Sequence, residues 1–341
     1  KGEYQKGLPA MLRSLQIIEE GLGPEHSAAG DRTTNISLIY NRLGQYEKGL
    51  EYAEASLANT ERIYGHSHQM FLTSLNNYGL LLTRLKRYKK AKKAYLHIID
   101  ELDKKGDAGI RYGIYLDNLA RIYKETGQLD SAKLHSLKSV QNALDHVGKE
   151  HYYYVIRSNN LATIYSAMGQ TERELEIYLS LIEPTRKVFG EHHPQYGIRY
   201  SNLASSYQDL GQYDKAAPAF EISTYNLIDQ FYYYYPILSE TDKVSYINKQ
   251  RDLIDKHFSF IPDDHSGSSS TFLQDLNLAI KGLALGSHLS IKSTDEKKLL
   301  KWQSLRSQIG DLYSSEQSEL IRDTLSLLIQ QAEELEVELL G

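Results

Sequence analysis

Asparagine recurs at a nearly constant interval along the first two-thirds of this 341-residue chain. The five members of this asparagine series are Asn35, Asn77, Asn118, Asn160 and Asn202, which lie 42, 41, 42 and 42 residues apart. A carboxamide offers both a hydrogen-bond donor and an acceptor, so a row of five can hold the main chain of an extended peptide of any sequence. The alternative is that each amide bonds the neighbouring helix and only fixes repeat packing.

If the series binds a peptide, polar residues one helical turn away would tune which side chains are preferred. These neighbours are Asn76, Arg84, Arg121, Lys124, Asn159 and Gln208. The predicted binding residues are therefore the asparagine series with Arg84, Arg121, Lys124 and Gln208.

Histidine also recurs, which raises the question of a metal site. His26, His68, His151 and His193 stand at equivalent points between repeats, and Gly109 takes that place once. Adjacent pairs such as His192 and His193 could be ligands, as could His66 and His68. However, the series members lie one repeat apart and no acidic partner recurs beside all of them. We interpret them as loop structure and expect no metal and no cofactor.

A basic run spans residues 86–93, with sequence KRYKKAKK. It could contact an acidic partner or RNA. The whole chain has a net charge of -5, from 39 Lys and Arg against 44 Asp and Glu, and no aromatic base-stacking motif accompanies the run. A solvated helix face is therefore favoured over nucleic-acid binding.

Composition excludes several kinds of chemistry. The chain has no cysteine, which rules out disulfides, zinc–thiolate sites and a cysteine nucleophile within it. No convergent acid–base or nucleophile constellation is evident, so we expect no catalysis by these residues. Apolar stretches end well before the roughly 20 residues of a membrane span. We expect a cytoplasmic protein. Because the chain opens in mid-repeat, an upstream targeting segment remains an alternative.

The elements that position these residues are pairs of helices. A turn segment recurs around residues 44, 86, 127, 169 and 211. Before each turn, a small residue and then a large one follow the asparagine at helical spacing, as Ala120 and Tyr123 follow Asn118. After each turn, a second helix shows small residues at Gly49, Ala91, Ala132 and Ala216, with Glu174 as the exception. The inner face of that helix continues with Ala53, Tyr95, Ser136, Tyr178 and Phe220.

Glycine marks the ends of the helix pairs. Gly23, Gly65, Gly106, Gly148 and Gly190 repeat at the same interval. Glycine just beyond a helix commonly takes a left-handed conformation, so we expect each of them to close a helix that way. Pro194 supports a helix start just afterwards.

These patterns resemble the tetratricopeptide repeat (TPR). The run Asn118-Leu119-Ala120, Tyr123, Gly127-Gln128-Leu129-Asp130-Ser131-Ala132 is similar to its consensus. The lengthened period and the connector from Gly190 to Pro194 resemble the long variant of kinesin light chains. The resemblance implies an all-α, right-handed superhelical solenoid of antiparallel helix pairs over residues 1–230, with about five full repeats after a half-repeat. It also implies that the asparagine series lies on the concave face.

The period fails beyond residue 230. We expect capping helices at 231–262, a linker at 263–271 rich in Ser, Asp and Gly, and a helical segment at 272–341. Four consecutive tyrosines, Tyr232 to Tyr235, cannot share one helix face, so they either cap the core or contact another domain.

Three stretches of this last segment, near residues 278–285, 305–313 and 332–339, resemble the helices that precede a CHAT domain in bacterial repeat proteins. CHAT is a caspase-like protease domain that requires a His-Cys pair. The resemblance implies a partner-recognition region that positions or restrains such a protease in cis. The alternative is a TPR sensor or assembly module of another bacterial signalling protein, such as a histidine kinase.

Overall fold

The computed structural model describes residues 2–234 without interruption. Beyond them it describes residues 250, 253–254, 298, 300–301, 304–305, 308, 324, 327–332 and 334–335. The chain forms two compact units, Lys1–Gln170 and Thr171–Gly341. The predicted linker at 263–271 lies outside the described residues, as do most of the stretches that resemble the CHAT-preceding helices.

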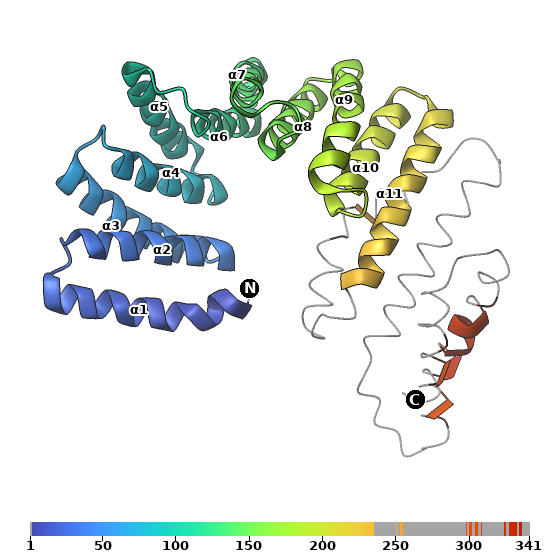
Figure 1. Ribbon diagram of the computed structural model, residues 1–341, viewed down its shortest axis with the longest axis horizontal. Helices are drawn as coiled ribbons and strands as arrows, with labels where there is room; N and C mark the ends of the chain where they lie inside the picture. Colours follow the sequence, from blue (N-terminus) through green and yellow to red (C-terminus); the bar gives the residue numbers. More distant parts are fainter. Residues whose placement is uncertain are drawn as a thin grey trace. The chain divides into compact units, whose positions relative to one another are not determined.

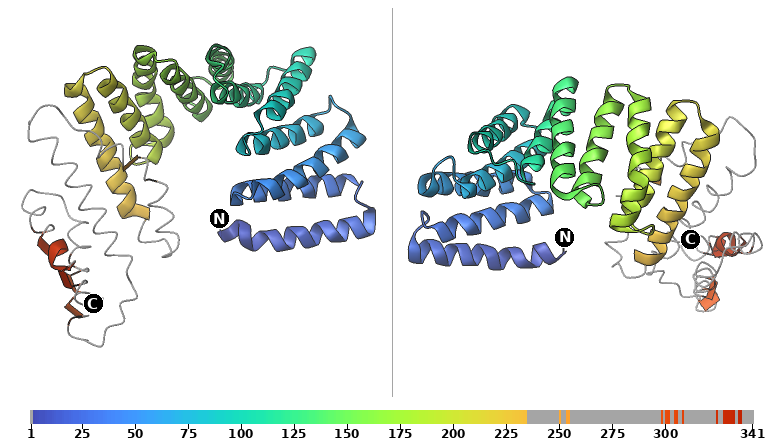
Figure 2. Two further views of the ribbon diagram at one scale, coloured as in Figure 1. Left: turned by 180° about the vertical axis from the view of Figure 1, so that it is seen from behind. Right: turned by 45° about the horizontal axis from the view of Figure 1, so that its top comes forward.

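Every regular element in the described part of the chain is an α-helix, which confirms the predicted all-α fold of antiparallel pairs (Figures 1 and 2). The first unit contains α1 (Gly2–Leu22), α2 (Ser27–Leu43), α3 (Tyr46–Tyr64), α4 (Gln69–Arg84), α5 (Tyr88–Lys105), α6 (Tyr112–Glu125), α7 (Leu129–Val147) and α8 (Tyr152–Ala167). The second contains α9 (Thr171–Phe189), α10 (Pro194–Asp209) and α11 (Tyr213–Tyr234).

Helix α11 runs across the predicted boundary at residue 230 and includes Tyr232 to Tyr234, while Tyr235 lies outside the described residues. The division into repeats, cap, linker and final helices therefore stays a prediction. Among the helices that the structure describes, none is long and apolar enough to cross a membrane.

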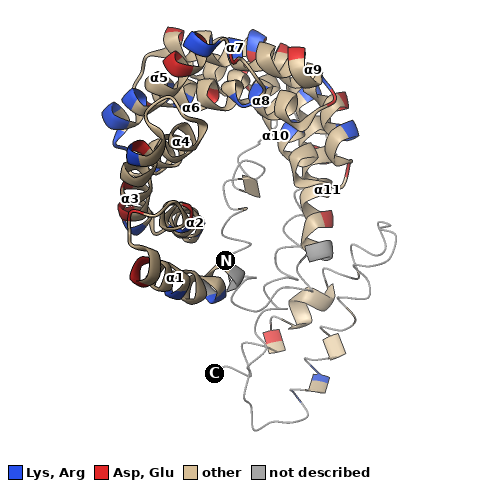
Figure 3. Ribbon diagram, turned by 60° about the vertical axis from the view of Figure 1, so that its left-hand side comes forward, with Lys and Arg blue, Asp and Glu red and all other residues tan. Residues whose placement is uncertain are grey.

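The first unit has an inner and an outer row of helices. Helices α2, α4 and α6 lie on the inner side of its curve, and α3, α5 and α7 lie outside them (Figure 3). Each inner helix packs against the next inner helix as well as against its outer partners. Residues that recur on α4, α6 and α8 are therefore brought side by side across this inner row.

The predicted small and large residues form the core. The predicted inner-face positions on the outer helices are all buried. Ala53 and Phe220 are 1 % exposed, and Tyr95 is 0 % exposed. Glu174 is buried at the place where other repeats carry Gly or Ala, one turn before Tyr178. The repeat thus tolerates one acidic side chain in a position that favours small ones.

The glycines between repeats all have positive φ, but the expected left-handed conformation is wrong for Gly65 and Gly148. Gly106 is left-handed, with φ 64° and ψ 21°. Gly65 and Gly148 instead have φ 76° with ψ 171° and 179°. That region is essentially closed to residues with a Cβ. The backbone just after the helix is extended there, which directs the chain toward the start of the next helix.

The repeated histidines are helix N-caps, which confirms their interpretation as loop structure. Nδ1 of His26, His68, His151 and His193 accepts the backbone N–H two residues on, at 3.1 to 3.2 Å. Such a bond satisfies one of the free donors at a helix start. Where Gly109 replaces histidine, α6 begins without a side-chain cap and Asp107 accepts the Gly109 N–H at 3.3 Å.

Lys86 offers a direct test of backbone strain. It has φ 57°, while the equivalent turns use Gly44, Gly127, Gly169 and Gly211 at φ 68° to 81°. A Cβ in this conformation costs about 1 kcal/mol. We expect Lys86→Gly to raise the free energy of unfolding in urea by about that amount, and Gly127→Ala to lower it. A Lys86→Gly variant less stable than the wild type would contradict this reading.

The His193 cap predicts a pH dependence. Burial lowers the pKa of His193 below its ordinary value, and Nδ1 accepts the capping bond only when it carries no proton. Its contribution to stability is fully present above the unfolded pKa of about 6.5. That contribution is lost as the pH falls through the lowered folded pKa. We expect the melting temperature to fall less between pH 7.5 and 5 in His193→Asn, whose amide caps without titrating. Parallel curves for both proteins would refute the role.

Candidate functional site

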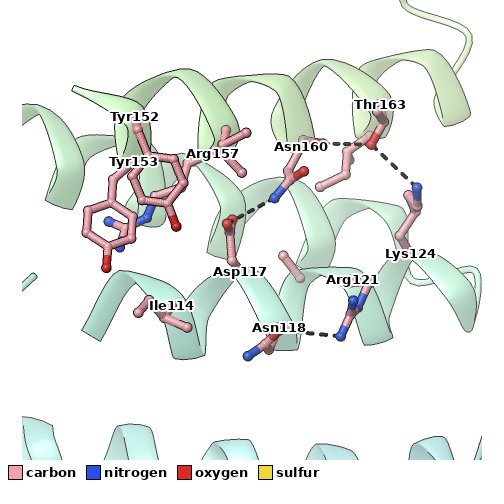
Figure 4. A pocket seen from close by; sticks show the side chains of 13 residues that line it. Ile114, Asp117, Asn118, Arg121, Lys124, Tyr152, Tyr153, Arg157, Asn160 and Thr163 are labelled. Atoms are coloured by element: carbon pink, nitrogen blue, oxygen red, sulfur yellow. Dashed lines mark hydrogen bonds between the residues drawn. The ribbon is translucent and has the colours of Figure 1, made fainter. Parts of the chain in front are cut away.

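A groove of about 320 Å³ lies between α6 and α8 in the first unit (Figure 4). The α6 residues that line it are Ile114, Asp117, Asn118, Ala120, Arg121 and Lys124. The α8 residues are Tyr152, Tyr153, Ile156, Arg157, Asn160, Thr163 and Ile164. Four of the predicted binding residues, Asn118, Arg121, Lys124 and Asn160, therefore meet in one place.

The two asparagines of the groove also tie neighbouring inner helices together. Asn160 donates from Nδ2 to Oδ2 of Asp117 at 3.0 Å, and Asn118 donates from Nδ2 to Oδ1 of Asn76 on α4 at 3.5 Å. Each asparagine thus bonds the residue that directly precedes the previous member of the series. Asp117 precedes Asn118, and Asn76 precedes Asn77. This is the packing role that the sequence left open, and it occurs at the rim of an accessible groove.

Arg121 and Lys124, two of the three cations that line the groove, are weakly engaged. Arg121 donates from one Nη to Oδ1 of Asn118 at 3.4 Å, and Lys124 donates to Oγ1 of Thr163 at 3.4 Å. Nε of Arg121 is buried without a hydrogen-bond partner. Among the described residues, neither cation forms an ion pair. Both bonds are at the long end for such donors, so both side chains retain donor capacity for a ligand.

Asp117 is the acidic group of the groove, and sequence reasoning missed it. Its Oδ1 is shielded from solvent and accepts no hydrogen bond. The Ser139 hydroxyl lies close enough to Asp117 to lower the pKa of its carboxyl, but it donates its single proton to the Gly113 carbonyl at 2.7 Å, so Oδ1 stays without a donor. Burial raises the pKa of Asp117 to about 6, against the opposing effects of the Asn160 bond, the Arg157 charge, the Ser139 hydroxyl and the Arg121 charge.

Arg157 anchors the floor of the groove rather than facing a ligand. It is 2 % exposed and donates to the Ile110 carbonyl at 2.8 Å, the Ser139 carbonyl at 3.2 Å and Oδ1 of Asn142 at 2.9 Å. Its guanidinium also lies 4.9 Å from the ring centre of Tyr153. One side chain of α8 thereby fixes α7 and the loop before α6.

Asn142 belongs to a second asparagine series that sequence reasoning missed. Asn59, Asn142 and Asn226 donate to carbonyls of the loop before the first helix of their own repeat, at 2.6 to 3.0 Å. These repeats carry Gly30, Gly113 or Gly197 on that first helix, where a Cβ would overlap the asparagine. The signal in the sequence was this pairing of Gly and Asn in alternate repeats.

The other predicted residues do not line this groove. Asn35 and Arg84 are exposed on α2 and α4, and Asn77 is buried on α4 at 8 % exposed. Asn202 and Gln208 are half-buried on α10 of the second unit. Their predicted contacts with a peptide stay a prediction.

The basic run lies at the start of α5, on the outer row. Arg87 pairs with Glu47 at 2.9 Å, and Lys92 lies 4.3 Å from the ring centre of Tyr123. The remaining lysines are exposed. In the described residues, no group of three or more His, Cys, Asp or Glu could hold a metal ion.

Comparison with known proteins identifies the repeat. Residues 31–100 and 154–222 match the tetratricopeptide repeat model, on either side of α6 and α7. The fold is similar to BtubC (BKLC) from P. vanneervenii, with a TM-score of 0.56 and 14 % identity over 65 % of this chain and 90 % of that one. It is also similar to the nearly identical TPR-like repeats of a Podosopora anserina kinesin light chain homologue, with a TM-score of 0.53 and 20 % identity over 58 % and 94 %.

No protein with a curated description matches the chain. The chain therefore carries tetratricopeptide repeats and resembles kinesin light chain-like TPR proteins in structure.

The anchoring role of Arg157 can be tested by removing its charge. Arg157→Leu would leave two carbonyls and the Asn142 amide without their donor, at a cost of about 3 kcal/mol. Urea unfolding should show this loss, and Arg157→Lys should recover only part of it because an ammonium cannot span the three acceptors. Arg173→Leu on the exposed surface of α9 is the control. Equal stability of Arg157→Leu and wild type would contradict the role.

Proposed function

We propose that the chain is a protein-binding scaffold whose first unit holds an extended polypeptide segment in the groove between α6 and α8. The observation that carries the proposal is the convergence of Asn118, Arg121, Lys124 and Asn160 in that groove, where Arg121 and Lys124 keep donor capacity for a ligand. These side chains come from helices one repeat apart and share no role in the apolar core.

The spacing of the inner row suits an extended chain. Packed helices lie about 8 to 10 Å apart, which corresponds to roughly three residues of an extended strand at about 3.3 Å each. A polypeptide that crosses the inner row would therefore meet the next helix at about every third residue. Side chains in between would reach Ile114, Ile156 or the ring of Tyr152, which is 46 % exposed.

The test is selection of a binder followed by variants of the groove. A random dodecapeptide library displayed on phage is selected against the whole chain, and the affinity of the chosen peptide is measured by fluorescence anisotropy. We expect the double variant Asn118→Ala, Lys124→Ala to weaken binding at least tenfold, about 1.4 kcal/mol. Lys89→Ala, an exposed change on the outer row, is the matched control.

Thermal melting separates binding from packing. The proposal expects the double variant to lose affinity while its melting temperature changes by only a few degrees. If affinity is unchanged, or if stability collapses along with it, the polar residues of this groove serve repeat packing and the proposed function is wrong.

We also propose that the scaffold belongs to a longer protein in which it positions or restrains a caspase-like CHAT protease in cis. The support is the likeness of residues 272–341 to the helices that precede such domains. The alternative is a sensor or assembly module of another signalling protein. Reading the gene beyond the codon for Gly341 tests this: a His-Cys pair in a caspase-like domain is expected, and histidine-kinase motifs would contradict it.

A further inference from the structure

Building on the proposed polypeptide binding, we propose that Asp117 and Arg121 together hold the main chain of one residue of the bound polypeptide. Asp117 accepts the backbone N–H of that residue, and Arg121 donates to its carbonyl oxygen. The asparagines of the groove then support this acid–base pair rather than contacting the main chain themselves.

The first observation is the unmet acceptor. Oδ2 of Asp117 accepts the Asn160 amide at 3.0 Å, whereas Oδ1 is buried and accepts nothing. A buried carboxylate oxygen without a donor is costly, so its presence calls for a donor from elsewhere. The last torsion of an aspartate side chain is broad and roughly two-fold, so a rotation that exchanges the two oxygens can present either of them to the groove.

The second observation is the unmet donor one turn along the same helix. Arg121 makes a single bond of 3.4 Å to Asn118, and its Nε has no partner. A guanidinium has five N–H donors, so most of its capacity is unused. The groove thus contains an acceptor and a donor that lack partners, both in a shielded site.

Asp117 and Arg121 lie one helical turn apart on α6 and both line the groove. Residues four apart on a helix are separated by about 6 Å along its axis. In an extended strand, the N–H and the C=O of one residue point to the same side, and those of the next residue point away. The long Arg121 side chain can reach back over this turn toward Asp117. Both groups can then meet the N–H and C=O of one residue where the polypeptide crosses α6, while its neighbours turn their own polar groups away.

The asparagine side chains of the groove already form hydrogen bonds within the protein. Asn160 donates to Asp117, and Asn118 accepts from Arg121 and donates to Asn76. Both bonds orient the acid–base pair. The acid itself is peculiar to this repeat, since the equivalent positions elsewhere are uncharged. Those positions are occupied by Thr34, Asn76, Asn159 and Ser201.

Maintaining the charge of Asp117 in the empty groove has a cost that a ligand donor would offset. Burial raises the pKa of Asp117 to about 6, although two cations face it, Arg121 on α6 and Arg157 on α8. Its neighbours on α7 and α4, Ser139 and Asn76, are uncharged. A group whose pKa is raised on folding contributes stability below its unfolded pKa and loses it as the pH rises through the folded value.

The main-chain contact is tested by combining peptide and protein changes. Each residue of the selected dodecapeptide is N-methylated in turn, which removes one N–H. With the wild type, we expect methylation at one interior position to weaken binding at least tenfold. With Asp117→Asn, which turns an amide donor toward the groove, binding should already be at least tenfold weaker, and methylation at that position should have no further effect.

Two measurements distinguish recognition from a structural role. Asp117→Asn should raise the melting temperature of the free protein at pH 7.5 while weakening peptide binding, whereas a purely structural Asp117 would lose both. The wild type should lose affinity as the pH falls through about 6, and Asp117→Asn should not. Asp130→Asn removes an equal charge from a side chain that is 91 % exposed on α7 and should change neither property.

The outcomes separate this inference from the function on which it rests. If the peptide binds but N-methylation weakens its binding to Asp117→Asn by the same factor as its binding to the wild type, the main-chain contact is wrong and polypeptide binding stands. If Asp117→Asn lowers the melting temperature, the unmet acceptor is wrong. If the library yields no binder, the proposed function fails and this inference with it.

Discussion

The apolar face that each helix pair presents to the next is the constraint on which this structure depends. A single pair cannot bury that face, so repeats must stack, and stacking at a fixed interval places equivalent side chains side by side. Small residues such as Ala120 and Ala132 permit the close approach of helices, and the buried ring of Tyr95 packs against Gly79. Polar residues of adjacent repeats converge on the inner helices without disturbing the core, and the proposed binding site uses these residues.

Polar interactions set the finer geometry of the stack. Histidine N-caps start four of the helices, and Asn59, Asn142 and Asn226 tie down the loops that precede first helices. Around the groove, Arg157 joins α8 to α7 and to the loop before α6. These bonds give α6 and α8 a defined separation, so the groove between them is preformed. Binding there would then cost little free energy for ordering the protein.

Much of this could be predicted from the sequence, because the period of 42 residues fixes both the helix pairs and their buried faces. The convergence of Asn118 and Asn160 follows from the same period. What could not be predicted is how far the neighbouring helices cover each repeated position. Asn35 is exposed and Asn77 buried although they occupy equivalent positions. Asp117 escaped notice because a single acid on a polar helix face carries no periodic signal, and its significance lies in an oxygen that packing leaves without a partner.

The most direct test of the account is a crystal structure of the chain bound to a selected peptide. We expect an extended segment in the groove between α6 and α8, with one backbone N–H within hydrogen-bonding distance of the Asp117 carboxylate and the carbonyl of the same residue accepting from Arg121. A peptide bound on the outer row, or one seated in the groove with Asp117 and Arg121 unpartnered as before, would contradict it.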